Sequence, residues 1–427
     1  MTPAVHEESG RATQVAGNLF RTESARLVAM LTSRLGVHRL QLAEDVVQEA
    51  LVRALQTWPY RGVPDNPAAW LTQTAKNLAL DHLRREQRWQ EKQDGIAAEH
   101  ERWLSAPLPG EPHTFADDTL RLMFVCSHPQ LSAEAQIALA LRTLCGFSPA
   151  EIAAAFLTTE AAISKRLVRA RHRVRELALP FAVPEPAELP TRLDGVLGTL
   201  YLLFNEGYKA SAGDRLVRED LCHEAIRLAQ LLTAHAATRA PRTHALLSLM
   251  QLSAARLPAR TDDAGNLLRL HEQNRAAWDQ AMIQQGIQNL GLAATGDALS
   301  EYHLEAGIAA CHSTAADDAA TDWPRILALY DRLVTLTASP VAAMNRAVAV
   351  ARVHGPQAGL DALHAITDRS SLESYHLFHA IRGALTAELG RLAEALTHFR
   401  MAGDLANLPA ERDFIARRIR ECEAGQQ

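Results

Sequence analysis

Two proline-rich breaks constrain this chain of 427 residues more than any other feature. The first break, SAPLPGEPHT, lies within residues 93–116, and the second, LPFAVPEPAELP, ends at Pro190. Each proline lacks an amide proton and clashes with the preceding helical turn, so neither stretch can be one continuous helix. The breaks predict three units, at about residues 15–92, 117–177 and 192–427, with 93–116 as a linker.

Each unit has the residue spacing of amphipathic helices. In the first unit, one buried helical face is expected to contain Val47, Ala50, Leu51, Ala54 and Leu55. Asn66-Pro67 predicts a helix start, and Ser148-Pro149-Ala150-Glu151 predicts a capping box. No alternating strand pattern bounded by hairpin turns is present in the sequence, so the predicted fold class is all-α.

Composition narrows the class of protein further. Hydrophobic residues make up 48% and charged residues 22% of the chain, enough apolar side chain to fill a core. No apolar stretch approaches the length of a membrane span, and the N-terminus lacks the pattern of a secretory signal. The five cysteines are far apart, without a CxxC pair. We therefore expect a cytoplasmic protein with no membrane segment, no metal site and no cofactor.

Residues 148–175 have the pattern of a helix-turn-helix. The first helix is expected at 149–156, the turn at Leu157-Thr158, and Thr159 is expected to cap the second helix. The apolar residues expected to be buried are Ile152, Phe156, Ile163 and Leu167. The second helix of such a motif can enter the major groove of DNA.

The charge of this second helix supports binding to DNA. The whole chain has a net charge of −5, but six basic and no acidic residues lie between Ala162 and Arg175. Basic side chains neutralise phosphates, and a basic run beside a helix-turn-helix is better explained by DNA binding than by solvation. The predicted duplex-binding residues are Thr159, Ser164, Lys165, Arg166, Arg169, Arg171 and Arg173.

The first unit combines a polar helix face with aromatic and basic residues. The outer face of AEDVVQEALVRAL contains Asp45, Gln48, Glu49 and Arg53. The segment TWPYRGVPDNP, which holds Trp58 and Tyr60, is expected to be a loop, and a helix with a basic outer face follows it. Aromatic rings beside a basic helix can form a platform for unstacked single-stranded bases.

The order of these segments resembles a bacterial RNA polymerase sigma factor of the extracytoplasmic-function class. AEDVVQEALVRAL looks like the region 2.2 helix, which binds the clamp of the polymerase β′ subunit. NPAAWLTQTAKNLALDHLRRE looks like region 2.4, which binds the −10 promoter element, and SPAEIAAAFLTTEAAISKRLVRARHRVR looks like region 4.2, which binds the −35 element. A Gly-Val pair is common in the family where this chain has Leu157-Thr158.

The resemblance implies partners and residues. Core RNA polymerase would bind through its β′ clamp to the polar face at 45–53 and through its β flap to region 4. The −10 element would contact Trp58, Tyr60, Lys76, Asn77, Asp81, Arg84 and Arg85, and the basic helix would contact the −35 duplex. A sigma factor has no catalytic residues of its own, so the chain is not expected to be an enzyme.

The C-terminal part has a weak internal repeat. LGRLAEALTHFRMA resembles a tetratricopeptide (TPR) unit, and Phe399 precedes Pro409 by the same ten residues that separate Tyr330 from Pro340. These two pairs are offset by about twice the ~34-residue TPR period. A generic helical domain with chance spacing is the alternative. With LDGVLGTLYLLFNEGYKAS before it, this part is similar to the extension of a sigma-factor subgroup in which the extension is thought to control activity.

The NEGY sequence within that segment has two possible roles. The rings of Tyr201, Phe204 and Tyr208 are best explained as helix core. The polar and glycine residues of this sequence are harder to explain by packing. We predict that they contact the sigma regions or an unidentified ligand or protein, with Asn205, Glu206, Gly207 and Tyr208 as the contact residues.

Two other classes of protein compete with the sigma factor. A helix-turn-helix regulator with a TPR-like sensor would bind DNA without joining polymerase, but it leaves the face at 45–53 unexplained. An enzyme is disfavoured because the sequence has no Walker loop, GxGxxG, HExxH or GxSxG motif. The pairs His223-Glu224 and Cys311-His312 lack the spacing of metal ligands.

Overall fold

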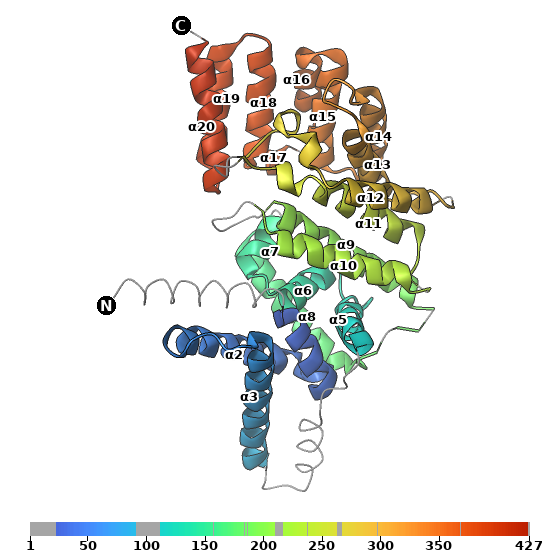
Figure 1. Ribbon diagram of the computed structural model, residues 1–427, viewed down its shortest axis with the longest axis vertical. Coiled ribbons are helices and arrows are strands. Elements are labelled where there is room, and N and C mark those ends of the chain that lie inside the picture. Colours follow the sequence, from blue (N-terminus) through green and yellow to red (C-terminus); the bar gives the residue numbers. More distant parts are fainter. Residues whose placement is uncertain are drawn as a thin grey trace. The chain divides into compact units, whose positions relative to one another are not determined.

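The computed structural model is all-α in the part of the chain that it describes, which confirms the predicted fold class (Figure 1). The structure describes residues 23–90 and 112–425, apart from 157, 183, 186, 210–216, 237, 263–266, 297 and 368. These ranges contain no strand, only an isolated bridge between Thr261 and Leu267. Most of the predicted linker lies outside the described residues. Within the described ranges no helix combines the length and apolar character that crossing a membrane requires.

The chain forms two compact units, residues 1–203 and 204–427. The division falls inside helix α9 (Leu189–Tyr208), which begins where the second proline-rich break ends. The N-terminal half of α9 packs on unit 1, where an added Cβ at Gly195 would lie 2.3 Å from the Gln136 side chain. Gly195 therefore allows the close approach of two helices, and residues 189–203 belong structurally to the unit that precedes the extension.

Unit 1 is built from α-helices of 7 to 24 residues around a largely aliphatic core. Besides the helical residues 23–35, it contains η1 (Val37–Arg39), α2 (Leu40–Arg61), α3 (Pro67–Gln90), α5 (Pro112–Cys126), α6 (Ala133–Cys145), α7 (Pro149–Ala155), α8 (Glu160–Leu177) and the start of α9. The predicted helix starts are confirmed. The Ala69 amide donates to Asn66 Oδ1 at 3.0 Å, and Ser148 and Glu151 form both hydrogen bonds of a capping box.

Helix α2 differs from the sequence prediction near its C-terminal end. Val47, Ala50, Leu51 and Ala54 are buried as predicted, but Leu55 is 44% exposed. The helix also continues into the first part of the predicted loop and ends only before Gly62, whose φ of 80° favours glycine. Pro59 lies in the last turn of α2. Trp58 is therefore a helical residue with only 2% of its surface exposed, so its assignment to a loop was wrong.

The helix-turn-helix of α7 and α8 has the predicted cap and most of the predicted core. Ile152, Ile163 and Leu167 are buried, and the Ala162 amide donates to Thr159 Oγ1 at 3.3 Å. Phe156 is only half-buried, because α7 ends at Ala155 and leaves this ring at the edge of the motif. Of the predicted turn, Leu157 lies outside the described residues.

Unit 2 is a series of helices that pack against their neighbours along the chain. It contains the end of α9, α10 (Glu219–Ala234), α11 (Pro241–Ala254), η2 (Leu257–Ala259), η3 (Leu270–Glu272), η4 (Arg275–Ala277), α12 (Gln280–Ala293), α13 (Glu301–Thr314), α14 (Trp323–Thr337), α15 (Pro340–His354), α16 (Pro356–His364), α17 (Ser370–Glu373), α18 (His376–Glu388), α19 (Leu392–Leu405) and α20 (Pro409–Ala424). The pairs α14–α15, α15–α16, α18–α19 and α19–α20 are in contact.

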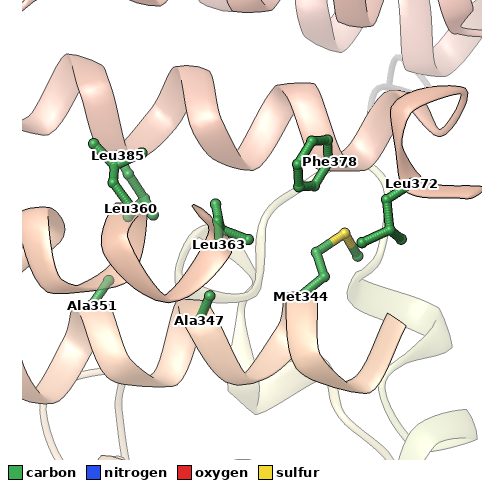
Figure 2. Packing of buried hydrophobic residues seen from close by; sticks show 8 residues of the cluster. All are labelled: Met344, Ala347, Ala351, Leu360, Leu363, Leu372, Phe378 and Leu385. Carbon is green, nitrogen blue, oxygen red and sulfur yellow. The ribbon is translucent and has the colours of Figure 1, made fainter. Parts of the chain in front are cut away.

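The residues of the proposed repeat occupy similar places in these pairs. Tyr330 lies on α14 and Pro340 opens α15, just as Phe399 lies on α19 and Pro409 opens α20. Figure 2 shows the core between α15 and α18, in which Met344, Leu363, Leu372 and Phe378 come together. The helical hairpins are thus present, while their assignment to the TPR class stays a prediction.

Candidate polymerase and nucleic-acid interfaces

The outer face of α2 is polar with an apolar part. Asp45 and Gln48 are exposed, and Glu49 accepts a hydrogen bond from Arg53 at 2.8 Å. Val52, 49% exposed, and Leu55 lie one and two turns beyond Gln48, so they continue the same face. Neither residue was predicted to belong to this face, because the helical spacing placed Leu55 in the core and Val52 has no polar group. An acidic helix face with exposed aliphatic residues is suited to docking on another protein.

A pocket of about 450 Å³ lies where α2 ends and α3 begins. Its lining consists of Arg53, Thr57, Trp58, Arg61, Gly62, Val63, Pro64, Trp70, Thr74 and Asn77. Trp58 packs edge to face on Trp70, with ring centroids 5.5 Å apart and an interplanar angle of 67°. In the described part of the chain no group accepts a hydrogen bond from the indole nitrogen of Trp58. The pocket therefore combines aromatic walls with polar groups, as a site for a planar heterocycle requires.

The structure separates the roles of the residues predicted to bind the −10 element. Trp58 and Asn77 line the pocket, and Asn77 Oδ1 accepts a hydrogen bond from Gln73 at 3.0 Å. Tyr60 is outside this lining and is 86% exposed. Arg53, predicted to bind polymerase, also lines the pocket. Trp70 was missed as a site residue, although the sequence places it in the first turn after Pro67.

The remaining predicted residues lie along α3. Asn77, Asp81 and the neighbours Arg84 and Arg85 are exposed and recur at helical spacing, so they share one face. Asp81 lies 3.8 Å from Arg84, an exposed contact that is worth little energy. Lys76 is half-buried, and burial, followed by the charge of Arg34, lowers its pKa. The exposed face of α3 is mixed in charge, with its basic end at 84–85.

The second hollow is a groove of about 640 Å³ between α6 and α8. It is lined by Gln130, Leu131, Ser132, Ala135, Thr159, Ala161, Ala162, Lys165, Arg166, Arg169, Ala170 and Arg173. These include all the predicted duplex-binding residues except Ser164 and Arg171. The groove thus brings the N-terminal end of α8 and three arginines to one surface.

The basic residues of this groove differ in how they are held. Lys165 and Arg169 are exposed and form no ion pair with any described residue. Arg166 pairs with Glu134 at 3.2 Å, and Arg173 contacts Gln130 and, at 3.2 Å, Glu176. Lys165 and Arg169 can therefore meet phosphates without breaking an existing pair.

Arg171 points to a different partner. Its guanidinium donates to Glu44 on α2 at 2.8 Å, which holds it away from the groove. Ser164 is half-buried and also lies outside the groove lining. The contact of these two residues with DNA stays a prediction. The pair could not be predicted from the sequence, because Glu44 and Arg171 are far apart in the chain and neither helix has a local pattern that indicates the contact.

Packing within unit 2 accounts for most of the NEGY sequence. Glu206 is buried and pairs with buried Arg218 at 3.4 Å. An added Cβ at Gly207 would lie 2.7 Å from the Cys222 amide nitrogen, so glycine allows α9 and α10 to meet. The Tyr208 ring lies 3.8 Å from the Arg260 guanidinium. Asn205 is exposed, so it is the residue of the four with a surface free for the predicted contact.

The histidine and cysteine residues give no metal centre in the described ranges. No group of three or more His, Cys, Asp or Glu side chains there has the arrangement to hold a metal ion. His312 is a packed residue of α13: burial, followed by the charge of Arg256, lowers its pKa to about 4.

Three segments of the chain match models of protein families. Residues 19–89 match sigma-70 region 2, and residues 121–174 match sigma-70 region 4. Residues 192–294 match a family of unknown function (DUF6596). Regions 2 and 4 in this order make the chain a sigma factor, a DNA-binding protein of transcription initiation that works with core RNA polymerase.

Two relatives show how far the similarity extends. An uncharacterized protein of Rhizobium meliloti (strain 1021) is 40% identical over 396 residues, which is 92% of each chain. The chain therefore belongs to the same family as this rhizobial protein, extension included. The probable ECF RNA polymerase sigma factor SigI of Mycobacterium tuberculosis is 28% identical over 172 residues, 40% of this chain and 57% of the mycobacterial one. No solved structure matches the chain.

Proposed function

We propose that the chain is a sigma factor of the extracytoplasmic-function class that docks on the β′ clamp of core polymerase through α2. The observation that carries the proposal is the outer face of α2, where acidic Asp45 and exposed Val52 and Leu55 lie on a helix that ends at the aromatic pocket. The name of the mycobacterial relative supports the subclass. Region 4 would meet the β flap and, through the groove of α6 and α8, the −35 duplex.

The pocket at the end of α2 is suited to a base extruded from the −10 element. Unstacking a base costs a few kcal/mol, and a pocket that stacks and hydrogen-bonds the extruded base offsets this cost. Half-buried Trp70, packed edge to face on buried Trp58, would supply the aromatic surface, and exposed Asn77 would supply polar contacts. Strand opening by this route requires neither ATP nor a catalytic residue of the factor.

The C-terminal extension is proposed to regulate the factor. Helix α9 runs without interruption from the residues that pack on region 4 into unit 2. A ligand or protein that bound the extension could thereby act on region 4 through a single helix. Exposed Asn205 on this helix is the proposed contact residue.

Binding of the purified full chain to core RNA polymerase tests the proposed function. The full chain should bind core, and Asp45→Arg should abolish binding while leaving the helical content unchanged, since Asp45 is exposed. Asp413→Arg on α20, an exposed aspartate without an ion pair to any described residue, is the matched control and should bind as wild type does. A chain that binds duplex DNA but not core would instead be the helix-turn-helix regulator. A shortened chain ending at Tyr208, which retains α9, then shows whether the extension helps or restrains binding.

A further inference from the structure

Region 2 and region 4 are joined within unit 1 by a carboxylate to which sequence analysis gave no role. Glu44 follows the buried Ala43 on α2 and is itself only 8% exposed, whereas its neighbour Asp45 faces solvent. One oxygen of Glu44 accepts a hydrogen bond from the Thr143 hydroxyl at 2.7 Å, and the other accepts one from Arg171 at 2.8 Å. Thr143 lies on α6 and Arg171 on α8, so both donors belong to region 4.

The surroundings of Glu44 make these two donors important. A buried carboxylate is costly unless it is paired and hydrogen-bonded. Cys126 supplies no compensating charge: burial raises the pKa of its thiol, and the charge of Glu44 raises it further, so the thiol stays neutral. Helix α8 also packs against η1, which extends the contact between the two regions beyond the ion pair.

Binding to a promoter requires the two regions to part. The −35 and −10 elements are somewhat less than two helical turns apart, or roughly 60 Å at about 35 Å per turn. A small domain is only about 30 Å across, so two regions that touch through α2 and α8 are too close to occupy both elements. The pair between Glu44 and Arg171 is therefore incompatible with simultaneous recognition of the −10 and −35 elements.

We propose that Glu44 is an intramolecular latch: the inner side of α2 is a docking surface for region 4 of the same chain and keeps the free factor closed. Polymerase, which holds regions 2 and 4 apart, opens the latch. Arg171 is then released, and its guanidinium suits a DNA phosphate as well as it suits a carboxylate. This inference rests on the proposed function, since only a factor that reads two separated elements needs to open.

Energy transfer between two dyes on the full chain tests the latch. Dyes at Arg26 in region 2 and Arg175 on α8 sit on exposed residues outside both proposed interfaces. Transfer should be high in the free wild-type chain and fall when core polymerase is added. Glu44→Gln should lower transfer in the free chain toward the polymerase-bound value. It should also tighten core binding roughly tenfold, the lower end of what a hydrogen bond to a charged group contributes.

Two further variants provide a control for charge and a second way to break the latch. Glu176→Gln is the control, because it also removes one negative charge but from a side chain that pairs only with His172 and Arg173 of its own helix among the described residues. It should leave energy transfer unchanged. Arg171→Gln removes the other partner of the ion pair, whose side chain is more exposed than that of Glu44. This variant replaces Glu44→Gln in the experiment if Glu44→Gln loses helical content. Equal transfer in free wild type and both latch variants would overturn the latch, even with core binding intact. Failure of wild type to bind core would overturn the proposed function instead.

Discussion

The amino group of Lys209 lies 3.0 Å from the carboxylate of Glu411, an ion pair that joins the residue after α9 to the first turn of α20. His376 Nε2, at the start of α18, lies 3.2 Å from the same oxygen. The first and last helices of unit 2 are thus tied together through a largely buried carboxylate. Glu411 also accepts a hydrogen bond from the Leu408 amide at 3.4 Å, so one side chain both caps α20 and closes the unit.

This cluster predicts a loss of stability in acid. Burial by itself would raise the pKa of Glu411, but His376 and Lys209 outweigh burial and lower the pKa to about 2. A depressed pKa means that the stabilisation is complete above the ordinary value of 4.5 and is lost as the pH falls toward 2. We expect a loss on the order of 2–3 kcal/mol in the free energy of unfolding over this window.

Denaturant titrations of the full chain between pH 6 and pH 2.5 would measure this loss. Glu411→Gln should be less stable than wild type at pH 6 and should show a shallower fall with acid. Glu423→Gln, an exposed carboxylate on the same helix, should follow the wild-type curve. A Glu411→Gln curve parallel to wild type would refute the role given to the ion pair.

A second prediction concerns the contact of α9 with α10. Gly207→Ala should destabilise unit 2 by about 1–3 kcal/mol, because the new methyl group would overlap backbone and side-chain atoms of Cys222. At Gly403, also helical, the nearest atom to an added Cβ is 3.7 Å away on Ile415. Gly403→Ala should therefore be neutral or stabilising by up to about 1 kcal/mol. Thermal unfolding of both variants measures the difference, and an equal effect would contradict the packing role of Gly207.

The two aromatic residues at the end of α2 should give opposite phenotypes. Trp58→Ala removes a buried ring and should destabilise region 2 by about 3–5 kcal/mol. Tyr60→Ala should leave the unfolding midpoint within experimental error, because the ring is 86% exposed, and should weaken binding to single-stranded DNA by about 1–3 kcal/mol if Tyr60 stacks on a base. Unchanged single-strand affinity would remove Tyr60 from the −10 interface.

The groove of α8 predicts a measurable salt dependence. Replacing Lys165 or Arg169 with alanine should lower the slope of log affinity against log salt by about one for each phosphate that the side chain neutralises. Arg166→Ala should have the same effect only if Arg166 exchanges Glu134 for a phosphate. Titrations with duplex DNA at several salt concentrations give these slopes, and exposed Arg332 on α14 offers an alanine control. If the Lys165 and Arg169 variants had the same slope as wild type, the DNA phosphates would not contact this groove.

Local signals in the sequence predicted local structure well. Asn66 and Ser148 start helices as expected, because a cap depends on residues three positions away. Predictions failed where a helix ended differently from the pattern, as at Leu55, Trp58 and Phe156. Pairs between distant segments could not be predicted, since neither Glu44 nor Glu411 has a signal in its own neighbourhood.

In the candidate site, too, local features were predicted from the sequence and contacts between distant segments were not. Sequence placed Lys165, Arg166 and Arg169 correctly on one surface, because helical spacing and a run of like charge determine it. Sequence also left Glu206 and Gly207 without a packing role, because their partners Arg218 and Cys222 come from beyond the end of α9. Residues that look free in a sequence can thus be committed to tertiary contacts.

Transcription reconstituted from core RNA polymerase, the purified full chain and total genomic DNA of the same organism tests the central claim most directly. We expect discrete start sites that are absent with core alone, that share two upstream elements somewhat less than two helical turns apart, and that disappear with Asp45→Arg. Start sites identical to those of core alone, from a chain that is folded and binds duplex DNA, would contradict a role as an initiation factor.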